Sequence, residues 1–309
     1  MQCGGLRAAG CRWRMKERKL RFAIFGNIYQ ERKSAAVQKL LAVLSAHEAD
    51  LVIDKSFHAF LQDVMQIAVP ACEVLEGGWF EADVAICMGG DGTFLNVAAR
   101  VGSKQIPILG INTGRLGFLA SFSAEDIEEA VERIYEGTYD VEHRSVLQLE
   151  CSDDVVKGYP FALNEIAVLK HDSSSMISIH TSIDGEYLTT YQADGLIVGT
   201  PTGSTAYSLS VGGPIIVPQG QTISLTPVAP HSLNMRPIVL NDSSELELKV
   251  ESRSHNFLVA IDGRSFSCPE TARLRIRKAG YQVAVVTRQD QTFFSTLRRK
   301  MMWGADQRQ

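Results

Sequence analysis

The sequence predicts an N-terminal α/β part with a Rossmann-like parallel sheet and helices, followed by a C-terminal part that is mainly antiparallel β. Strand-like and helix-like segments alternate over residues 21–138, which is typical of a parallel sheet with helices on its faces. From about Val146, short β-like runs follow one another, with two Asp-Gly pairs between them. The 309 residues are 45% hydrophobic and 21% charged, which is ordinary for a folded globular chain.

In the N-terminal part, each predicted strand is followed by glycine or asparagine. Arg21–Phe25 is β-like and is closed by Gly26-Asn27, and a helical pattern follows from about Glu31 to Ala46. The next predicted elements are a strand, a helix and a strand, at Asp83–Met88, Phe94–Val101 and Ile106–Ile111.

The clearest helix of the sequence is predicted to begin at Ser123. Ser123 and Asp126 resemble a capping box, in which side chains satisfy the first free N–H groups of a helix. Gly137 suits the left-handed residue that ends a helix. Between these ends, apolar residues recur with helical spacing at Ile127, Ala130, Val131, Ile134 and Tyr135.

Short β-like runs predict the strands of the C-terminal part, at Leu147–Cys151, Phe161–Leu169, Met176–Ile183, Glu186–Tyr191, Glu245–Glu251, Phe257–Ile261, Arg273–Arg277 and Tyr281–Thr287. Asp184-Gly185 and Asp262-Gly263 are typical of hairpin turns, and a last helix is expected at Thr292–Trp303. We therefore expect four parts: a basic leader that is disordered or not native at 1–20, the α/β part at 21–138, the β-rich part at 139–288, and a C-terminal helix at 289–309 that returns to the N-terminal part.

The formal charge of −4 is unevenly distributed along the chain. Residues 1–21 contain seven basic side chains and one acid, so the remaining residues carry a formal charge of −10. An acidic body of this kind argues against a nucleic-acid partner. The leader lacks the apolar stretch of a secretory signal and contains no serine. A tail upstream of a start at Met15 is the favoured interpretation, and a targeting signal is the alternative.

Cysteine and histidine usage bears on compartment and metal binding. The six cysteines are scattered without a C-x-x-C pair, so reduced thiols and a cytoplasmic location are expected. The seven histidines form no H-E-x-x-H or H-x-x-E-H pattern, so no dedicated protein metal site is expected. No apolar run approaches the ~20 residues of a membrane-spanning helix, so no membrane partner is expected.

Three glycine-containing loops follow predicted strands or β-like runs: GGDGT at 89–93, GINTGRLG at 110–117 and TPTGSTAYSLSVGGP at 200–214. Glycines let backbone N–H groups approach an anion closely, and a helix N-terminus adds a favourable dipole. One such loop is most often only a tight turn. Three in one chain favour phosphate binding.

Asp91 is the unusual residue of the first loop. A carboxylate inside a phosphate-binding loop repels the ligand unless a cation or a proton transfer accounts for it. Two functional roles fit: a ligand of nucleotide-bound Mg²⁺, or a general base for a hydroxyl that attacks phosphorus. A helix N-cap is the structural alternative. The loop matches neither the Walker nor the Rossmann dinucleotide fingerprint.

Several further motifs narrow the choice of family, because GGDGT is shared by diacylglycerol and sphingosine kinases. Asn164-Glu165, DGLIVGTPTGSTAYSLSVGGP at 194–214, PHSLNMRPIVL at 230–240 and FFSTLRRKMMWG at 293–304 together resemble NAD kinases. The resemblance runs from about Arg21 to Asp306. It implies transfer of the γ-phosphate of ATP to the 2′-hydroxyl of the adenosine ribose of NAD. It also implies a divalent cation, Mg²⁺ carried with ATP, and a homo-oligomer, either a dimer or a tetramer.

The resemblance also implies roles for individual residues. Asp91 matches the general base that takes the proton of the 2′-hydroxyl. Asn164 and Glu165 match a pair that contacts the NAD adenosine and its ribose hydroxyls, and Asp194 matches an acidic contact of the dinucleotide. The loop that is expected to hold the ATP phosphates comprises Gly89, Gly90, Gly92 and Thr93. A further segment lines the NAD site, and its Tyr207 is expected to meet NAD bound to a neighbouring subunit; it comprises Thr205, Ala206, Tyr207, Ser208, Leu209 and Ser210.

Asn164-Glu165 is a polar pair inside the apolar run FALNEIAVL. On one strand the two side chains point to opposite faces, so at least one is buried without a partner unless a ligand or loop supplies one. An edge strand that exposes Glu165 is the alternative, as a core position is for Tyr207. Asp262-Gly263 is interpreted as a turn and not as part of the site, and His231 is likewise excluded.

Two positions depart from the pattern of the family. Asn96 and Gln192 stand where many relatives carry basic residues that help to neutralise phosphates, which weakens any argument for polyphosphate as the donor. Two rival functions are a lipid kinase, which would need an apolar acceptor cleft, and a dinucleotide-sensing module without turnover, against which the intact Asp91 argues.

Overall fold

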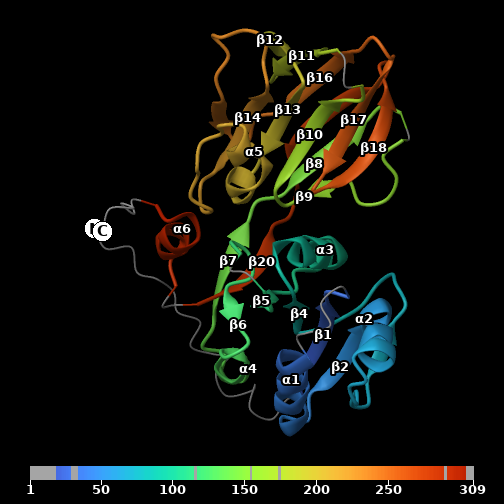
Figure 1. Ribbon diagram of the computed structural model, residues 1–309, viewed down its shortest axis with the longest axis vertical. Helices are drawn as coiled ribbons and strands as arrows, with labels where there is room; N and C mark the ends of the chain where they lie inside the picture. The colour runs from blue at the N-terminus through green and yellow to red at the C-terminus, as the bar shows by residue number, and fades with distance from the viewer. Residues whose placement is uncertain are drawn as a thin grey trace. The chain divides into compact units, whose positions relative to one another are not determined.

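The computed structural model describes residues 19–28, 34–114, 117–153, 155–172, 175–288 and 291–303. The expected leader at 1–20 therefore lies almost entirely outside the described residues. The described residues divide into two compact units, one drawn from Met1–Val97, Ile106–Glu142 and Ala284–Gln309, the other from Ala98–Gln105 and His143–Val283. Figure 1 shows the elements of both units.

A sheet in the order β3-β2-β1-β4-β5-β20-β7, with β6 beside β5, forms the centre of the first unit. The pairs from β3 through to β20 are parallel, as predicted. Every residue of β4 is buried, as expected for a parallel strand with both faces covered. The strands are β1 Arg21–Gly26, β2 Asp50–Asp54, β3 Glu73–Leu75, β4 Val84–Met88, β5 Ile108–Asn112, β6 Phe122–Ser123, β7 Asp140–Arg144 and β20 Val283–Thr287.

Helices α1, α2 and α4 contribute buried side chains to the same apolar core as the strands of the sheet. Helices α1 and α4 pack beside each other (Figure 1). In α4, Ile127, Ala130, Val131 and Ile134 are buried, which confirms the predicted periodicity, and Gly137 ends the helix at φ 65°. The helix begins at Ile127, and Ser123, its predicted first residue, ends β6. The expected interaction between Ser123 and Asp126 is present, because Asp126 Oδ2 accepts the N–H of Ser123 (2.6 Å). The helices are α1 Ser34–Ala46, α2 Lys55–Ala59 with a π-helical turn at Phe60–Val64, α3 Asp91–Val101, α4 Ile127–Glu136 and α6 Phe293–Met301.

The last strand corrects one assignment of the sequence. The run predicted at Tyr281–Thr287 among the antiparallel strands is β20, and its Val285 lies opposite Ile108 of β5 in a parallel pair. Its buried VAVVT sequence suits a strand inside a covered parallel sheet. Helix α6 follows, and the Thr292 side chain accepts a hydrogen bond from the N–H of Ser295 (3.2 Å) as its N-cap.

The second unit is a sandwich of two antiparallel sheets around one apolar core. One sheet runs β15 Ile238–Asn241, β14 Thr222–Val228, β13 Gly195–Gly199, β10 Glu165–Lys170, β17 Asn256–Ile261 and β18 Arg264–Pro269. The other runs β12 Glu186–Ala193, β11 Ile177–Ile183, β16 Leu246–Glu251, β19 Arg273–Lys278, β8 Leu147–Cys151 and β9 Phe161–Ala162. Short helical turns lie at Gly102–Lys104, at Thr202–Thr205 and at α5, Tyr207–Ser210.

Both predicted Asp-Gly hairpin turns are confirmed. Asp184 and Gly185 have φ of 52° and 83° between β11 and β12, and Asp262 and Gly263 have φ of 46° and 80° between β17 and β18. Two successive residues with positive φ give the type of turn that matches the twist of a hairpin.

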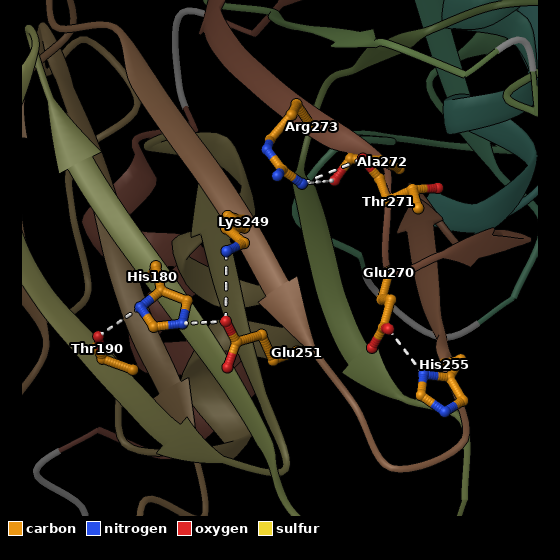
Figure 2. Close-up of polar contacts among 9 residues, drawn as sticks. All are labelled: His180, Thr190, Lys249, Glu251, His255, Glu270, Thr271, Ala272 and Arg273. Atoms are coloured by element: carbon orange, nitrogen blue, oxygen red, sulfur yellow. Dashed lines mark hydrogen bonds and ion pairs between the residues drawn. The ribbon is translucent and has the colours of Figure 1, made fainter.

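A polar network crosses three strands of the second sheet (Figure 2). His180 Nδ1 lies 2.8 Å from Thr190 Oγ1 on β12, and its Nε2 lies 3.2 Å from Glu251 Oε1 on β16. Lys249 also contacts Glu251, at 3.3 Å. The two contacts of His180 join neighbouring strands and support the register, whereas Lys249 and Glu251 lie on the same strand. Exposed ion pairs of this kind contribute little to stability, about 0–1 kcal/mol each.

Candidate active site

The strand order of the parallel sheet places two of the three glycine loops at one edge. From β1 the sheet extends through β2 and β3 on one side and through β4 and β5 on the other, so the order of the strands reverses between β1 and β4. Ligands of open parallel sheets bind outside the carboxyl ends of the strands at such a switch point. The segment 89–93 directly follows β4, and Thr113-Gly114 directly follows Asn112, the last residue of β5. This edge is therefore the candidate site of the first unit.

The three glycines of 89–93 differ in what a side chain would meet at each position. A Cβ on Gly89 would overlap the Thr93 side chain, so this glycine is required for packing. Cβ atoms on Gly90 and Gly92 would meet nothing within 4 Å. Neither of these two residues has a positive φ. The fold would thus accept a side chain at both positions. Because glycine has none, a ligand has room to approach the backbone there.

Asp91 begins α3, but its carboxylate binds a neighbouring loop. Oδ2 accepts the N–H of Phe118 (2.8 Å), and Oδ1 accepts the N–H groups of Leu119 (3.0 Å) and Ala120 (3.4 Å). Gly117 permits this arrangement, because a Cβ there would overlap Asp91 Oδ1. A carboxylate offers about four acceptor positions. The three N–H groups fix the orientation of Asp91 and leave one position on Oδ2.

A cation lies beside that open position. Lys300 of α6 places Nζ 3.6 Å from Asp91 Oδ2 and 4.4 Å from the centre of the Phe118 ring. The Phe118 ring also contacts the Phe293 ring, with centroids 6.2 Å apart. Sequence reasoning did not assign Lys300 to the site. Its only signal was its place in the motif at 293–304.

A polar cavity of about 500 Å³ lies at the same edge of the first unit. Asn112, the last residue of β5, and Gly114 form part of its wall. Arginines and hydroxyl side chains supply donors suited to an anion. Its other lining residues are Ser121, Phe122, Ser123, Glu125, Asp126, Arg288, Gln291, Ser295 and Arg299.

In the second unit, Asn164 and Glu165 lie at a break between two strands. The single strand predicted at Phe161–Leu169 is wrong: β9 ends at Ala162, the chain bends, and β10 begins at Glu165. The edge-strand alternative is also wrong, because β10 lies between β13 and β17. Asn164 is only 8% exposed. Within the described residues, Asn164 Oδ1 and Glu165 Oε2 are buried and have no hydrogen-bond partner.

The third glycine loop wraps around this bend. Thr200 binds it twice, through its N–H to Asn164 O (2.9 Å) and its Oγ1 to Leu163 O (2.6 Å). Gly203 packs so closely that a Cβ would overlap the carbonyl of Asn164. The backbone N–H of Tyr207 donates to the Glu165 carboxylate. The structure thus brings the 200–207 segment to the Asn164-Glu165 pair, as expected for one site.

Asp262 completes the surroundings of this pair. Oδ2 accepts the N–H of Leu163 (2.7 Å), and Oδ1 accepts those of Asn164 (2.8 Å) and Glu165 (3.1 Å). Burial, and then the charge of Asp262, raise the pKa of Glu165 to about 7. Sequence reasoning interpreted Asp262 as a turn residue only. It is a turn residue, and its side chain also holds the bend.

The remaining expected residues are distributed between two places. Ser208 is buried with Oγ 2.9 Å from Thr226 Oγ1, whereas Tyr207 is 38% exposed and is not a core residue. Asp194 pairs with Lys170 (2.7 Å) at the far end of β10. In the β10–β13 register Glu165 lies opposite Gly199 and Leu169 opposite Gly195. At 3.4 Å per residue, Asp194 is about 17 Å from Glu165 along the strands, so this unit does not bring the two together.

Among the described residues there is neither a cluster of metal-binding side chains nor a membrane-spanning helix. No group of three or more His, Cys, Asp or Glu side chains there could hold a metal ion. No helix in the same part of the chain is long and apolar enough to cross a membrane.

Known families match both halves of the chain. Residues 22–139 match the ATP-NAD kinase N-terminal domain, and residues 163–288 match the ATP-NAD kinase C-terminal domain. The chain is 61% identical over 289 residues to the NAD kinase of Bacteroides fragilis, covering 94% of this chain and 100% of that protein. It is 41% identical over 285 residues to the NAD kinase of Porphyromonas gingivalis, covering 92% and 98%.

Two solved structures share the fold. Yeast NADH kinase complexed with NADH superposes with a TM-score of 0.83 at 22% identity, covering 93% of this chain and 89% of that chain. The NAD kinase of Archaeoglobus fulgidus in complex with ATP gives a TM-score of 0.68 at 25% identity, covering 92% and 98%. With both family domains matched in order and close relatives aligned over nearly their whole length, the chain belongs to the ATP-NAD kinase family.

Proposed function

We propose how named residues of this chain perform the reaction of its family, the ATP-dependent formation of NADP from NAD. The chain is a phosphotransferase, and its substrates are the nucleotides ATP and NAD. The 2′-oxygen of the adenosine ribose forms a bond to the γ-phosphorus of ATP, the bond from that phosphorus to the β,γ-bridging oxygen breaks, and ADP leaves. The 2′-hydroxyl loses its proton in this step, and a carboxylate of the protein can accept it.

Asp91 is our candidate for the general base. The observation that carries this assignment is its carboxylate, fixed by three backbone N–H groups at the switch point of the sheet with one acceptor position left on Oδ2. Such a group can orient a hydroxyl and take its proton as the O–P bond forms. The N-cap alternative receives no support from the hydrogen bonds of Asp91, which lead to 118–120.

The ATP phosphates are assigned to the loop formed by Gly89, Gly90, Gly92 and Thr93. The space beside Gly90 and Gly92 supports this assignment, since phosphate oxygens need close approach to backbone N–H groups. We propose that Mg²⁺ enters as part of the substrate, bound to the triphosphate, where it neutralises charge that develops during transfer.

The NAD adenosine is assigned to Asn164 and Glu165. Their two unpartnered oxygens support this, because a buried polar atom left without a hydrogen bond costs about 1–3 kcal/mol, and ribose hydroxyls can donate to both. Asp194 and the segment 205–210 are proposed as further NAD contacts, because their motifs resemble those of NAD kinases. Asp194, at the far end of β10, would have to meet a different part of a dinucleotide from the part that Glu165 meets.

The deciding experiment is a coupled assay for NADP with purified protein, ATP, Mg²⁺ and NAD. Formation of NADP that depends on all three additions is the expected result. Omission of Mg²⁺ tests the cation, and a sphingoid base or diacylglycerol in place of NAD tests the lipid-kinase rival. NAD binding without NADP formation would instead identify a sensing module and refute the proposal.

Two broader assignments accompany the mechanism. We propose a homo-oligomer, a dimer or tetramer, in which the half-exposed Tyr207 contacts NAD bound to a neighbouring subunit. If analytical sedimentation at the concentration of the assay showed that the active protein is a monomer, this proposal would be contradicted. We also propose a cytoplasmic location, since the scattered cysteines suit a reducing compartment. Cell fractionation tests the location.

A further inference from the structure

The hairpin turn between β17 and β18 does more than connect two strands. Asp262 of the turn and Arg264, the first residue of β18, bind the backbone that leads into β10. Besides the three N–H groups held by Asp262, Arg264 donates from Nη1 to Tyr159 O (2.8 Å) and from Nη2 to Phe161 O (2.9 Å). The turn therefore binds donors and acceptors on either side of the 162–163 peptide.

We propose that Asp262 is a positioning residue for NAD, which acts by holding the bend at 163–165 so that Asn164 and Glu165 present their free oxygens to the ribose hydroxyls. This inference rests on the proposed assignment of the NAD adenosine to that pair. Asp262 itself is the acceptor of backbone N–H groups, so it has no need to touch NAD.

The other hairpin of this unit shows that turn geometry does not require such a role. Asp184 has the same Asp-Gly sequence and a similar φ, 52° against 46° for Asp262. Its carboxylate accepts one N–H, from Glu245 (2.8 Å), at an exposed position. Three N–H groups gathered on the half-buried carboxylate of Asp262 thus exceed what a hairpin needs. Asp184 also provides a matched control.

The central test compares Asp262→Asn with Asp184→Asn. An asparagine amide keeps one acceptor oxygen and turns an NH₂ group toward an N–H, so the bend loses its position. We expect Asp262→Asn to weaken NAD binding about 10- to 100-fold by calorimetry, the range of one or two lost charge-assisted hydrogen bonds. KM for NAD should rise by a similar factor, with kcat and KM for ATP within about threefold. Asp184→Asn should leave all of these values unchanged.

A double-mutant cycle with Glu165→Gln separates positioning from general loss of structure. If Asp262 acts through Glu165, the two residues are coupled and their losses do not add. The double variant then binds NAD no more weakly than whichever single variant has the lower NAD affinity. Additive losses would overturn the proposal, as would wild-type NAD affinity in Asp262→Asn or an equal loss in Asp184→Asn.

Amide hydrogen exchange gives a readout that does not depend on activity. Asp262→Asn should speed exchange at Leu163, Asn164 and Glu165 while protection of the β11–β16 ladder stays as in the wild type. If Asp262→Asn does not fold, Arg264→Lys keeps the charge but loses the two-carbonyl fork, and should raise KM for NAD in the same direction; no change there would overturn the proposal. Failure of the wild type to make NADP would refute the proposed function. The hydrogen-exchange result would still show whether Asp262 holds the bend at 163–165.

Discussion

Asp91→Asn probes both the chemistry and the architecture of the first unit. Sequence reasoning alone predicts a variant that folds normally and loses activity. The three N–H groups on the carboxylate change that expectation. An asparagine can keep its oxygen near Leu119 and Ala120, but its NH₂ group then faces the N–H of Phe118, which the wild type binds at 2.8 Å.

The structural cost follows from that mismatch. An unsatisfied donor at a partly buried position costs about 1–3 kcal/mol. For a unit of this size, 1 kcal/mol lowers the melting temperature by about 2–4 °C. We therefore expect Asp91→Asn to melt a few degrees below the wild type while remaining folded at assay temperature, as measured by calorimetry and circular dichroism.

The chemical cost is larger. Loss of a general base lowers the rate by about 10²–10⁴-fold, so kcat for NADP formation should fall by this factor, with KM for NAD and ATP nearly unchanged. Gly117→Ala is the control for architecture alone, because its Cβ displaces the carboxylate without removing it. It should destabilise the protein at least as much, yet keep more activity. Near-normal turnover in Asp91→Asn would refute the base assignment, and a wild-type melting temperature would refute the argument from the N–H groups.

Three further changes test the second unit. Gly203→Ala should cost about 1–3 kcal/mol of stability by denaturant unfolding and weaken NAD binding, since its Cβ meets the carbonyl of Asn164. Glu165→Gln should remove a pH dependence of the free energy of unfolding. In the folded wild type the pKa of Glu165 is raised from 4.5 to about 7, so the protonated side chain stabilises the fold below pH 4.5. This contribution, about 3 kcal/mol, is lost as the pH rises to 7. Urea unfolding across that range should show the wild type falling relative to Glu165→Gln, and parallel curves would contradict the cause. Tyr207→Ala mixed with Asp91→Asn should recover activity in mixed oligomers if Tyr207 serves a neighbour's site, and no recovery would contradict that arrangement.

Periodicity predicted the elements whose burial is regular. Leu147–Cys151 has the predicted bounds, and the apolar face of α4 is buried as expected. Some of the missed strands are short or charged, such as β3 with Glu73–Leu75 and β7 with DVEHR. Others, β2, β13 and β14, are buried and apolar and were missed as well. Their place in the sheet comes from pairing with neighbours, which no local pattern records.

Positioning residues were missed for a related reason. The sequence shows Asp184-Gly185 and Asp262-Gly263 as equivalent hairpin turns, and locally they are. Only the tertiary register places one of them against the N–H groups of the 163–165 bend. Lys300 likewise reaches Asp91 through the docking of α6 within its unit. The residues assigned to the substrates stand in recognisable motifs, whereas the residues that hold them in place are identified only by their tertiary contacts.

The two carboxylates assigned to the site differ in their surroundings, and the difference predicts a measurable proton. Asp91 receives three N–H groups and a nearby ammonium, so its hydrogen-bonding needs are nearly met before any ligand arrives. Glu165 receives one N–H and keeps one buried oxygen unpartnered, and burial, followed by the charge of Asp262, raises its pKa to about 7. Ribose hydroxyls that donate to this oxygen favour the ionised carboxylate. NAD binding at pH 6–7 should therefore release a fraction of a proton, seen by calorimetry as a binding enthalpy that varies with the ionisation heat of the buffer. Glu165→Gln should abolish the variation, and an unchanged dependence in that variant would show that the proton comes from elsewhere and that Glu165 does not meet the ribose.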